Sequence, residues 1–280
     1  KTAFLLALLD GLFIVVGGVV LGRAGILIGL VVGVLANAVS YWNSDKIAIA
    51  VARGVPVTPQ QAPELHRIVD ELCREANMPK PRVYVCDDPS PNAFATGRNP
   101  SHAAVCCTSG ILNLVTAREL RGVLGHELAH VRNRDILTAS VAATIAAGIG
   151  VLAQLAMLFS FFGGGRDERD GGNPLMLLLV AILAAPAAAV IQLAISRSRE
   201  YQADRSGAQL THDPLALANA LRKLDAQTRR IPMQVAPAVA PLFIVNPFGG
   251  RSVALSSLFS THPPLEDRIR RLEQMATSAG

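Results

Sequence analysis

Charged residues are scarce in this chain. Asp, Glu, Lys and Arg make up 17% of its 280 residues, whereas hydrophobic residues make up 51%. Soluble globular domains carry about 25% charged residues, so the composition excludes an ordinary soluble protein and predicts long apolar segments. The length allows one or two domains.

The chain also lacks any block of basic residues and any pair of cysteines with CxxC spacing. Its net charge of +5 is modest and its Lys and Arg residues flank the apolar segments, so we expect no nucleic-acid partner. Of the four cysteines, Cys106 and Cys107 adjoin in a predicted strand, where successive side chains face opposite ways. All four are therefore expected to be reduced, buried thiols, in keeping with a soluble part that faces the cytosol.

Four apolar runs are long enough to cross a bilayer, which takes about 20 residues. They cover approximately residues 3–22, 25–42, 136–163 and 174–195. We therefore predict transmembrane hairpins at 1–42 and 136–195, with soluble parts at 43–135 and 196–280. Asp10 interrupts the first run, and we expect it to lie near the membrane surface or to face another helix.

The arginines and lysines predict the orientation of the chain. The two soluble parts hold 22 of the 26 Lys and Arg residues, and the turns between paired runs hold only Arg23, Arg166 and Arg169. Because cytoplasmic segments carry the excess of Lys and Arg, both soluble parts are predicted to face the cytoplasm.

The stretch from Thr116 to Arg134 contains His126-Glu127-Leu128-Ala129-His130, an HExxH motif. A capping box formed by Thr116 and Glu119, followed by apolar residues at helical spacing, predicts a helix. On a helix, residues four apart lie one above the other, so His126 and His130 can bind one metal ion. Glu127 can accept a proton from a metal-bound water that attacks a peptide carbonyl, which is the chemistry of a zinc peptidase.

Hydrolytic zinc sites usually have a third protein ligand beside a water molecule. The helix predicted from Ser196 to Leu210 meets the HExxH helix at the cytoplasmic side of the membrane, and its Glu200 and Asp204 share one face. We assign Glu200 as the third ligand of one Zn²⁺ ion, and Asp204 as the acceptor of a hydrogen bond from the outer nitrogen of a ligand histidine. The alternative is that both carboxylates only pair with neighbouring arginines.

Three short strands are predicted before the HExxH helix, at residues 82–86, 92–97 and 103–108. An earlier helix is predicted with Thr58 as its N-cap and Pro59 at its first position. A small sheet followed by the HExxH helix predicts an α+β fold, in which an edge strand beside the metal can pair with an extended peptide.

Several features together resemble the HtpX-type membrane proteases, which are gluzincins related to the CAAX prenyl protease. The resemblance rests on the four apolar runs and on the motifs HELAH at 126–130, SRSREYQAD at 196–204, PNAFATG at 91–97 and FSTHPPLEDRI at 259–269. It implies four transmembrane helices that carry a cytoplasmic gluzincin-type metalloprotease domain. It also implies that His126, His130 and Glu200 are the zinc ligands and that Glu127 is the general base.

The resemblance further implies a location and a class of substrate. The chain would be a multi-pass zinc endopeptidase of the bacterial cytoplasmic membrane, degrading misfolded membrane proteins under heat or envelope stress. The substrate-binding residues would be those of the edge strand: Asn92, Ala93, Phe94, Ala95 and Thr96. His262 would stabilise the oxyanion of the tetrahedral intermediate; alternatively, it forms only a rigid turn that caps the last helix.

Two other functions are compatible with parts of the sequence. In an intramembrane metalloprotease the HExxH motif lies within an apolar span, whereas here charged residues flank it closely on both sides. A non-catalytic zinc-binding scaffold in the membrane would not need Glu127, because a structural zinc site requires no general base. We therefore predict an active metalloendopeptidase at the membrane surface.

Overall fold

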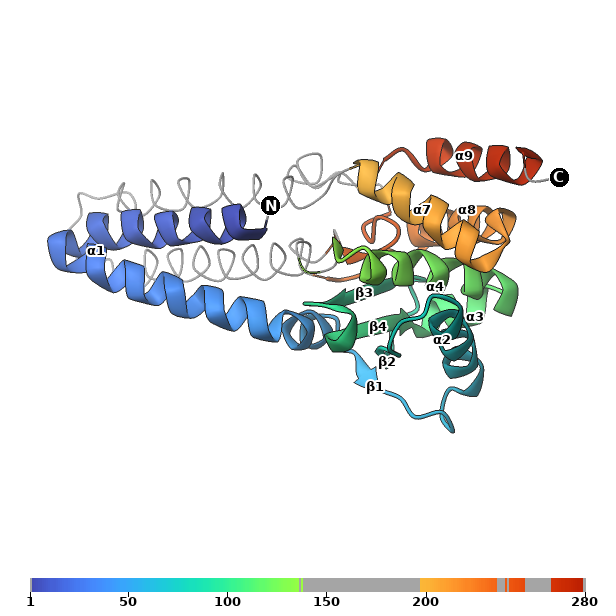
Figure 1. The fold of residues 1–280 in the computed structure, drawn as a ribbon, viewed down its shortest axis with the longest axis horizontal. Coiled ribbons are helices and arrows are strands. Elements are labelled where there is room, and N and C mark those ends of the chain that lie inside the picture. The colour runs from blue at the N-terminus through green and yellow to red at the C-terminus, as the bar shows by residue number, and fades with distance from the viewer. Residues whose placement is uncertain are drawn as a thin grey trace, which may run out of the picture.

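The computed structural model of the chain describes residues 2–135, 137, 197–235, 240, 242–249 and 263–278. His262 and, apart from residue 137, the runs predicted at 136–163 and 174–195 lie outside the described residues. Figure 1 shows an α+β domain with one long helical arm. The described elements, in chain order, are α1 (Thr2–Val51), β1 (Val55–Pro56), α2 (Pro63–Glu75), β2 (Arg82–Cys86), β3 (Ala93–Gly97), the 3-10 helix η1 (Pro100–His102), β4 (Ala103–Thr108), α3 (Ser109–Leu114), α4 (Ala117–Arg132), α7 (Arg197–Thr211), α8 (Pro214–Arg230) and α9 (Leu265–Ser278).

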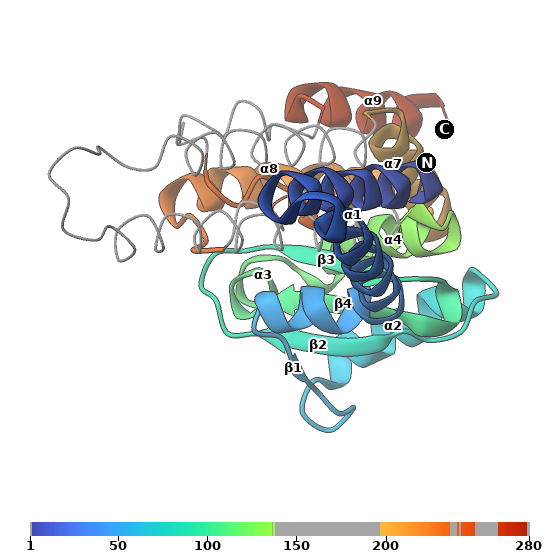
Figure 2. The same ribbon diagram turned by 90° about the vertical axis from the view of Figure 1, so that its left-hand side faces the viewer.

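The arm is α1, which folds back on itself so that its two limbs lie side by side (Figure 1 and Figure 2). Between the limbs, the Nδ2 atom of Asn37 donates a hydrogen bond of 2.8 Å to the Asp10 carboxylate. Gly33 lies at the same contact, where a Cβ atom would come within 2.7 Å of Asp10 Oδ1. Asp10 therefore faces the opposite limb, as expected for a carboxylate within an apolar run.

Among the described residues, no single helix is both long and apolar enough to cross a bilayer. The segments Arg23–Val39 and Tyr41–Val51, bent by 67° from one another, reach that length and composition only as a pair. The number of spans therefore stays a prediction from the sequence.

The sheet has four strands in the order β1-β2-β4-β3, so that β3 forms one edge. Strand β4 pairs in parallel with β2 and antiparallel with β3. The strands predicted at 82–86 and 103–108 are confirmed, and the third begins at Ala93, one residue later than predicted. The sequence pattern does not predict β1, because its two residues are too few to show alternation.

Helices cover both faces of the sheet. On one face, α2 and α4 pack on the strands around the fully buried side chains of Val69, Val105 and Leu124. On the other face, the end of α1 and Phe243 cover Phe94. The four cysteines are free and buried, as predicted.

Helix α2 begins at Pro63, so the predicted start at Thr58 is wrong. Residues 58–62 form a separate turn, in which the N–H groups of Gln61 and Ala62 both donate to the Thr58 carbonyl. Ala62 has φ −138° and ψ 66°, outside the helical region, because a residue that precedes proline is disfavoured in the α conformation. The proline that starts the helix is therefore the second one in this segment.

Helices α4 and α7 approach closely at two glycines. A Cβ atom on Gly207 would lie 2.7 Å from the main-chain nitrogen of His126, and a Cβ atom on Gly125 would lie 2.6 Å from the Thr211 side chain. Only glycine permits this backbone-to-backbone packing. The two helices that carry the predicted metal ligands are thereby held in a fixed register.

Candidate metal centre

The HExxH motif lies on α4, and the predicted capping box of Thr116 and Glu119 is present at its start. One turn apart on this helix, the Nε2 atoms of His126 and His130 are 3.2 Å from each other. Two imidazole nitrogens at this distance face a common point.

Helix α7 adds Glu200 to the same point. Its two carboxylate oxygens lie 3.5 Å from His130 Nε2 and 3.8 Å from His126 Nε2. Ligands bound at about 2.0–2.1 Å to a tetrahedral ion lie about 3.3 Å from one another. The three side chains therefore fit around one tetrahedral ion, and a set of two imidazoles and one carboxylate is one that zinc accepts.

Asp204 lies one turn beyond Glu200, and its Oδ1 is 2.9 Å from His126 Nδ1. A carboxylate in this place fixes the tautomer of the imidazole and leaves Nε2 free to face a metal. Asp204 forms an ion pair with another helix. Arg268 of α9 donates to it, from Nε over 2.9 Å and from Nη2 over 2.8 Å.

The protonation states of His126 and Asp204 suit metal binding at the first histidine. Burial lowers the pKa of His126 to about 4, although the hydrogen bond to Asp204 acts in the opposite direction. Burial alone would raise the pKa of Asp204, but the charge and hydrogen bonds of Arg268 outweigh it and lower the pKa to about 2. At neutral pH the imidazole is neutral and the carboxylate is ionised, as a metal ligand and its hydrogen-bond acceptor must be.

Arg268 is the main residue of the site that the sequence analysis missed. It is 1% exposed, and its Nη1 also donates over 3.0 Å to the carbonyl of Ile244. The signal was present in the sequence, since Arg268 falls on the apolar face of α9 between Leu265 and Leu272. A charged side chain at such a position requires a buried partner.

Glu127 projects from α4 toward the edge strand. Its Oε2 accepts a 2.8 Å hydrogen bond from the N–H of Ala95, and the residue is 3% exposed. Burial raises the pKa of Glu127 to about 8, and the nearby Glu200 carboxylate acts in the same direction. A carboxyl group with a pKa near neutrality can both accept and return a proton.

The predicted substrate-binding residues lie on β3 or just before it. Two of them, Asn92 and Ala93, already form hydrogen bonds with a later segment of the chain, at Ile244 and Val245. Asn92 is fully buried; its Nδ2 donates to the Val245 carbonyl over 3.1 Å, and its Oδ1 accepts from the Val245 N–H over 3.4 Å. The N–H of Ile244 donates to the Ala93 carbonyl over 3.1 Å.

Packing reinforces this contact between the edge strand and Leu242–Val245. The rings of Phe94 and Phe243 meet edge to face, with centroids 5.1 Å apart. All four residues of Leu242–Val245 are buried, and Thr96 of the strand is fully buried as well. This segment closes the N-terminal end of the β3 edge.

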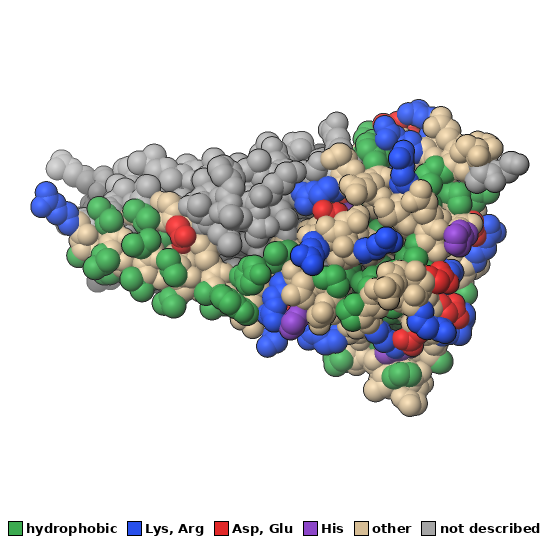
Figure 3. All heavy atoms as spheres, viewed as in Figure 1, with side chains coloured by type: hydrophobic (Ala, Val, Ile, Leu, Met, Phe, Trp, Pro, Cys, Tyr) green, Lys and Arg blue, Asp and Glu red, His purple; other side chains and the backbone are tan. Residues whose placement is uncertain are grey.

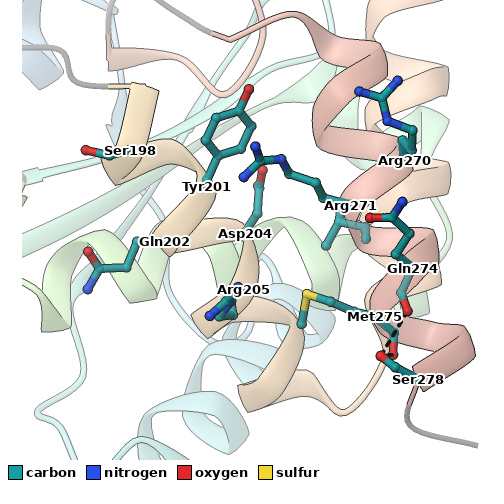
Figure 4. A pocket seen from close by; sticks show the side chains of 11 residues that line it. Ser198, Tyr201, Gln202, Asp204, Arg205, Arg270, Arg271, Gln274, Met275 and Ser278 are labelled. Carbon is teal, nitrogen blue, oxygen red and sulfur yellow. Dashed lines mark hydrogen bonds between the residues drawn. The ribbon is translucent and has the colours of Figure 1, made fainter.

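Tyr201, the neighbour of Glu200, faces α9 rather than the metal centre. The Arg271 guanidinium lies 3.8 Å from the centroid of its ring. Figure 4 shows this pair in a cavity of about 720 Å³ between α7 and α9. His262 lies outside the described residues, so its assignment to the oxyanion stays a prediction.

The pKa values predict the pH dependence of the metal-free protein. The folded chain keeps the Glu127 proton up to about pH 8, whereas a glutamate in the unfolded chain loses it near pH 4.5. Between about pH 7 and 8 the folded state therefore binds more protons, and its stability falls as the pH rises. Thermal unfolding of chelator-treated protein should give a lower Tm at pH 8 than at pH 7. The Glu127→Gln variant should show a smaller decrease, and equal decreases in both proteins would contradict this assignment.

The geometry defines a class of protein. Two histidines and a glutamate on two helices, with a second glutamate directly after the first histidine, form the site of an HExxH metallopeptidase. Comparison with known sequences gives the family: the profile of peptidase family M48 matches residues 59–276, and the chain belongs to this family. The chain is a metalloprotease, and the resemblance to the HtpX-type proteases is confirmed.

Curated relatives match over nearly the whole chain. The "Protease HtpX homolog" of Syntrophobacter fumaroxidans is 52% identical over 98% of both chains. The protein of the same name from Arthrobacter sp. is 52% identical over 96% of this chain and 92% of its own, and that from Burkholderia thailandensis is 50% identical over 99% and 96%.

The crystal structure of Ste24p from S. mikatae shares the fold. It aligns with a TM-score of 0.50 over 87% of this chain, at 19% sequence identity. The alignment covers 57% of that longer protein. This likeness concerns the fold alone.

Proposed function

We propose that the chain is a membrane-bound zinc endopeptidase that hydrolyses misfolded or damaged membrane proteins at the cytoplasmic face of the bacterial cytoplasmic membrane. The observation that carries the proposal is the buried Glu127 carboxylate, which lies between the edge strand and the three-ligand group. Three zinc ligands alone would not distinguish a hydrolytic enzyme from another zinc protein. A carboxylate that lies between such ligands and a strand able to pair with a peptide is in the position that a general base for hydrolysis requires.

The residues would act as follows. His126, His130 and Glu200 would hold the zinc ion, which when bound acidifies a water molecule and polarises the substrate carbonyl. Glu127 takes a proton from the attacking water as the oxygen of that water bonds to the carbonyl carbon. Glu127 then delivers the proton to the amide nitrogen as the C–N bond breaks, releasing an amine and a carboxylic acid.

Two further residues would support this reaction. Asp204 keeps the imidazole of His126 in orientation through the hydrogen bond at Nδ1. His262, by its resemblance to the family motif, would donate a hydrogen bond to the oxyanion.

An extended peptide would bind along β3. The Thr108 N–H donates to the Asn92 carbonyl, so alternate residues pair with β4 and the main-chain groups of Ala93 and Ala95 point outward. The N–H of Ile244 donates to the Ala93 carbonyl, and the N–H of Ala95 donates to the Glu127 carboxylate. The next outward-facing group along the strand is the Ala95 carbonyl, which would accept a hydrogen bond from the main chain of a substrate peptide. Main-chain pairing of this kind tolerates many sequences, which suits unfolded substrates.

The membrane location is supported by the surface of α1. Figure 3 shows hydrophobic side chains along the outer surface of this arm. They include large apolar residues that are 41–66% exposed: Ile26, Leu27, Ile28, Leu30, Val31, Val32, Val34, Leu35 and Val39. An apolar surface of this extent suits lipid, and Trp42 at its end, 58% exposed, suits the interface.

The other two functions are less well supported. A non-catalytic scaffold gives no role to the buried Glu127 carboxylate, whose burial is unfavourable for its charged form. An intramembrane protease would need α4 within lipid, whereas α4 packs among β3, α2, α7 and α8.

The test is cleavage of casein, an unfolded protein, by the purified full chain in detergent. We expect cleavage with one Zn²⁺ bound per chain, loss of cleavage with a chelator, and recovery on addition of zinc but not of magnesium. A preparation that binds zinc but cleaves no unfolded protein would contradict the proposal and favour the scaffold.

A further inference from the structure

The second histidine of the metal centre also has a carboxylate behind it. His130 Nδ1 lies 3.5 Å from Oδ2 of Asp135, the next acidic residue after Glu127. The other carboxylate oxygen of Asp135 lies 3.9 Å from Nη1 of Arg199. The side chains are largely buried, at 15% exposed for His130 and Arg199 and 19% for Asp135.

His130, Asp135 and Arg199 form a series of imidazole, carboxylate and guanidinium. A series of the same order lies behind the first histidine, His126. There, His126 contacts Asp204, and Arg268 donates to Asp204, at distances of 2.8 to 2.9 Å. Imidazole, carboxylate and guanidinium follow one another in both cases, but the contacts of the second series are longer.

Arg199 has hydrogen-bonding capacity left for a closer contact. Within the described part of the chain, its Nε and Nη2 atoms are buried and have no hydrogen-bond partner. Buried guanidinium groups without partners are unfavourable. A small movement of Asp135 toward both neighbours would shorten the two contacts of the series together.

We propose that Asp135 is a positioning residue for His130 and that Arg199 acts through Asp135, so that each histidine of the zinc site is held by its own carboxylate and arginine. The inference rests on the proposed function, because it assumes that His130 binds zinc. It has a further consequence for the chain. Asp135 directly precedes the third apolar run and Arg199 follows the fourth, so the pair joins both ends of the predicted second hairpin to the zinc site.

The test measures zinc affinity, without substrate. The full-length chain in detergent is stripped of metal and titrated with Zn²⁺ against a chromogenic chelator. We expect Asp135→Ala to weaken zinc binding about 10- to 100-fold, the usual range for loss of an outer carboxylate, and Arg199→Gln to weaken it by a smaller factor. The double variant should bind no more weakly than Asp135→Ala, because Arg199 acts through Asp135.

Matched controls separate positioning from folding. Asp225→Ala removes a carboxylate that pairs with Arg229 of its own helix α8, and Arg205→Gln removes an exposed arginine of α7, the helix that carries Arg199, so both should keep parental affinity. The Tm of each metal-free variant is recorded, and Asp135→Leu, which keeps a similar size but has no acceptor oxygen, replaces Asp135→Ala if the latter fails to fold.

Several outcomes would overturn the inference. Folded Asp135 variants with affinity within twofold of the parent would remove Asp135 from the site, and additive losses in the double variant would remove the role of Arg199. A parent chain that binds no zinc would overturn both this inference and the proposed function. A parent that binds zinc, loses affinity in Asp135→Ala and yet cleaves nothing would support the inference while the proposed function fails.

Discussion

Replacing Glu127 with glutamine should reduce casein cleavage about 1,000-fold or more while one zinc ion stays bound, because a general base contributes roughly 10²–10⁴-fold. The amide keeps the size of the side chain and can still accept the hydrogen bond from the Ala95 N–H, which Glu127 accepts over 2.8 Å. It cannot take the proton of the attacking water. The three proposed zinc ligands are unchanged, so zinc content measured on the same samples should equal that of the parent.

A matched control lies on the same helix. Glu119→Gln changes the other glutamate of α4, and glutamine can complete the capping box with Thr116 as glutamate does. This variant should keep parental cleavage. If Glu127→Gln retains more than a tenth of the parental rate in a preparation free of other proteases, Glu127 is not the general base.

The second large effect is expected for Arg268→Ala. Arg268 is 1% exposed and donates two hydrogen bonds to Asp204, so its loss leaves a buried carboxylate without its cation. Breaking a buried pair in this way costs about 3–5 kcal/mol of folding stability. Because Asp204 orients His126, zinc affinity should also fall about 10- to 100-fold. Thermal unfolding with and without zinc, together with chelator competition, measures both effects.

Two variants define what Arg268 supplies. Arg268→Lys keeps the charge but not the planar fork that contacts both Asp204 oxygens, so it should restore only part of the stability. Arg270→Ala, two residues further along α9, removes an arginine whose side chain is 65% exposed and paired with Asp267, and it should behave like the parent. An Arg268→Ala variant with the Tm and zinc affinity of the parent would show that the pair with Asp204 is not needed.

Signals within one helix or strand predicted their part of the structure well. The capping box at Thr116, the four-residue spacing of the histidines and the alternation in β2 and β4 are local patterns, and the structure has those elements where the sequence predicts them. The start of α2 was the local failure, because two prolines compete for the first position and the residue before Pro63 is excluded from the helix.

Contacts between distant segments could not be predicted in the same way. The partner of Asp204 lies 64 positions away in α9, and the contact of Asn92 with Val245 spans 153 positions. No periodicity within one segment specifies which distant side chain completes a buried group. The sequence does show that Arg268 lies on an apolar face and needs a partner, but it does not show which carboxylate that partner is.

The distribution of the site along the chain bears on its biosynthesis. The ribosome adds about 5–20 residues per second, so α4 is complete seconds before Glu200 is made, and Arg268 follows His126 by 142 positions. A nascent chain that carries both histidines still lacks Glu200, the proposed third ligand, and after α7 is made it lacks Arg268, the cation that holds Asp204. The three proposed ligands are therefore together only after all four predicted apolar runs have been synthesised, and Asp204 gains its buried cation only when α9 has been added.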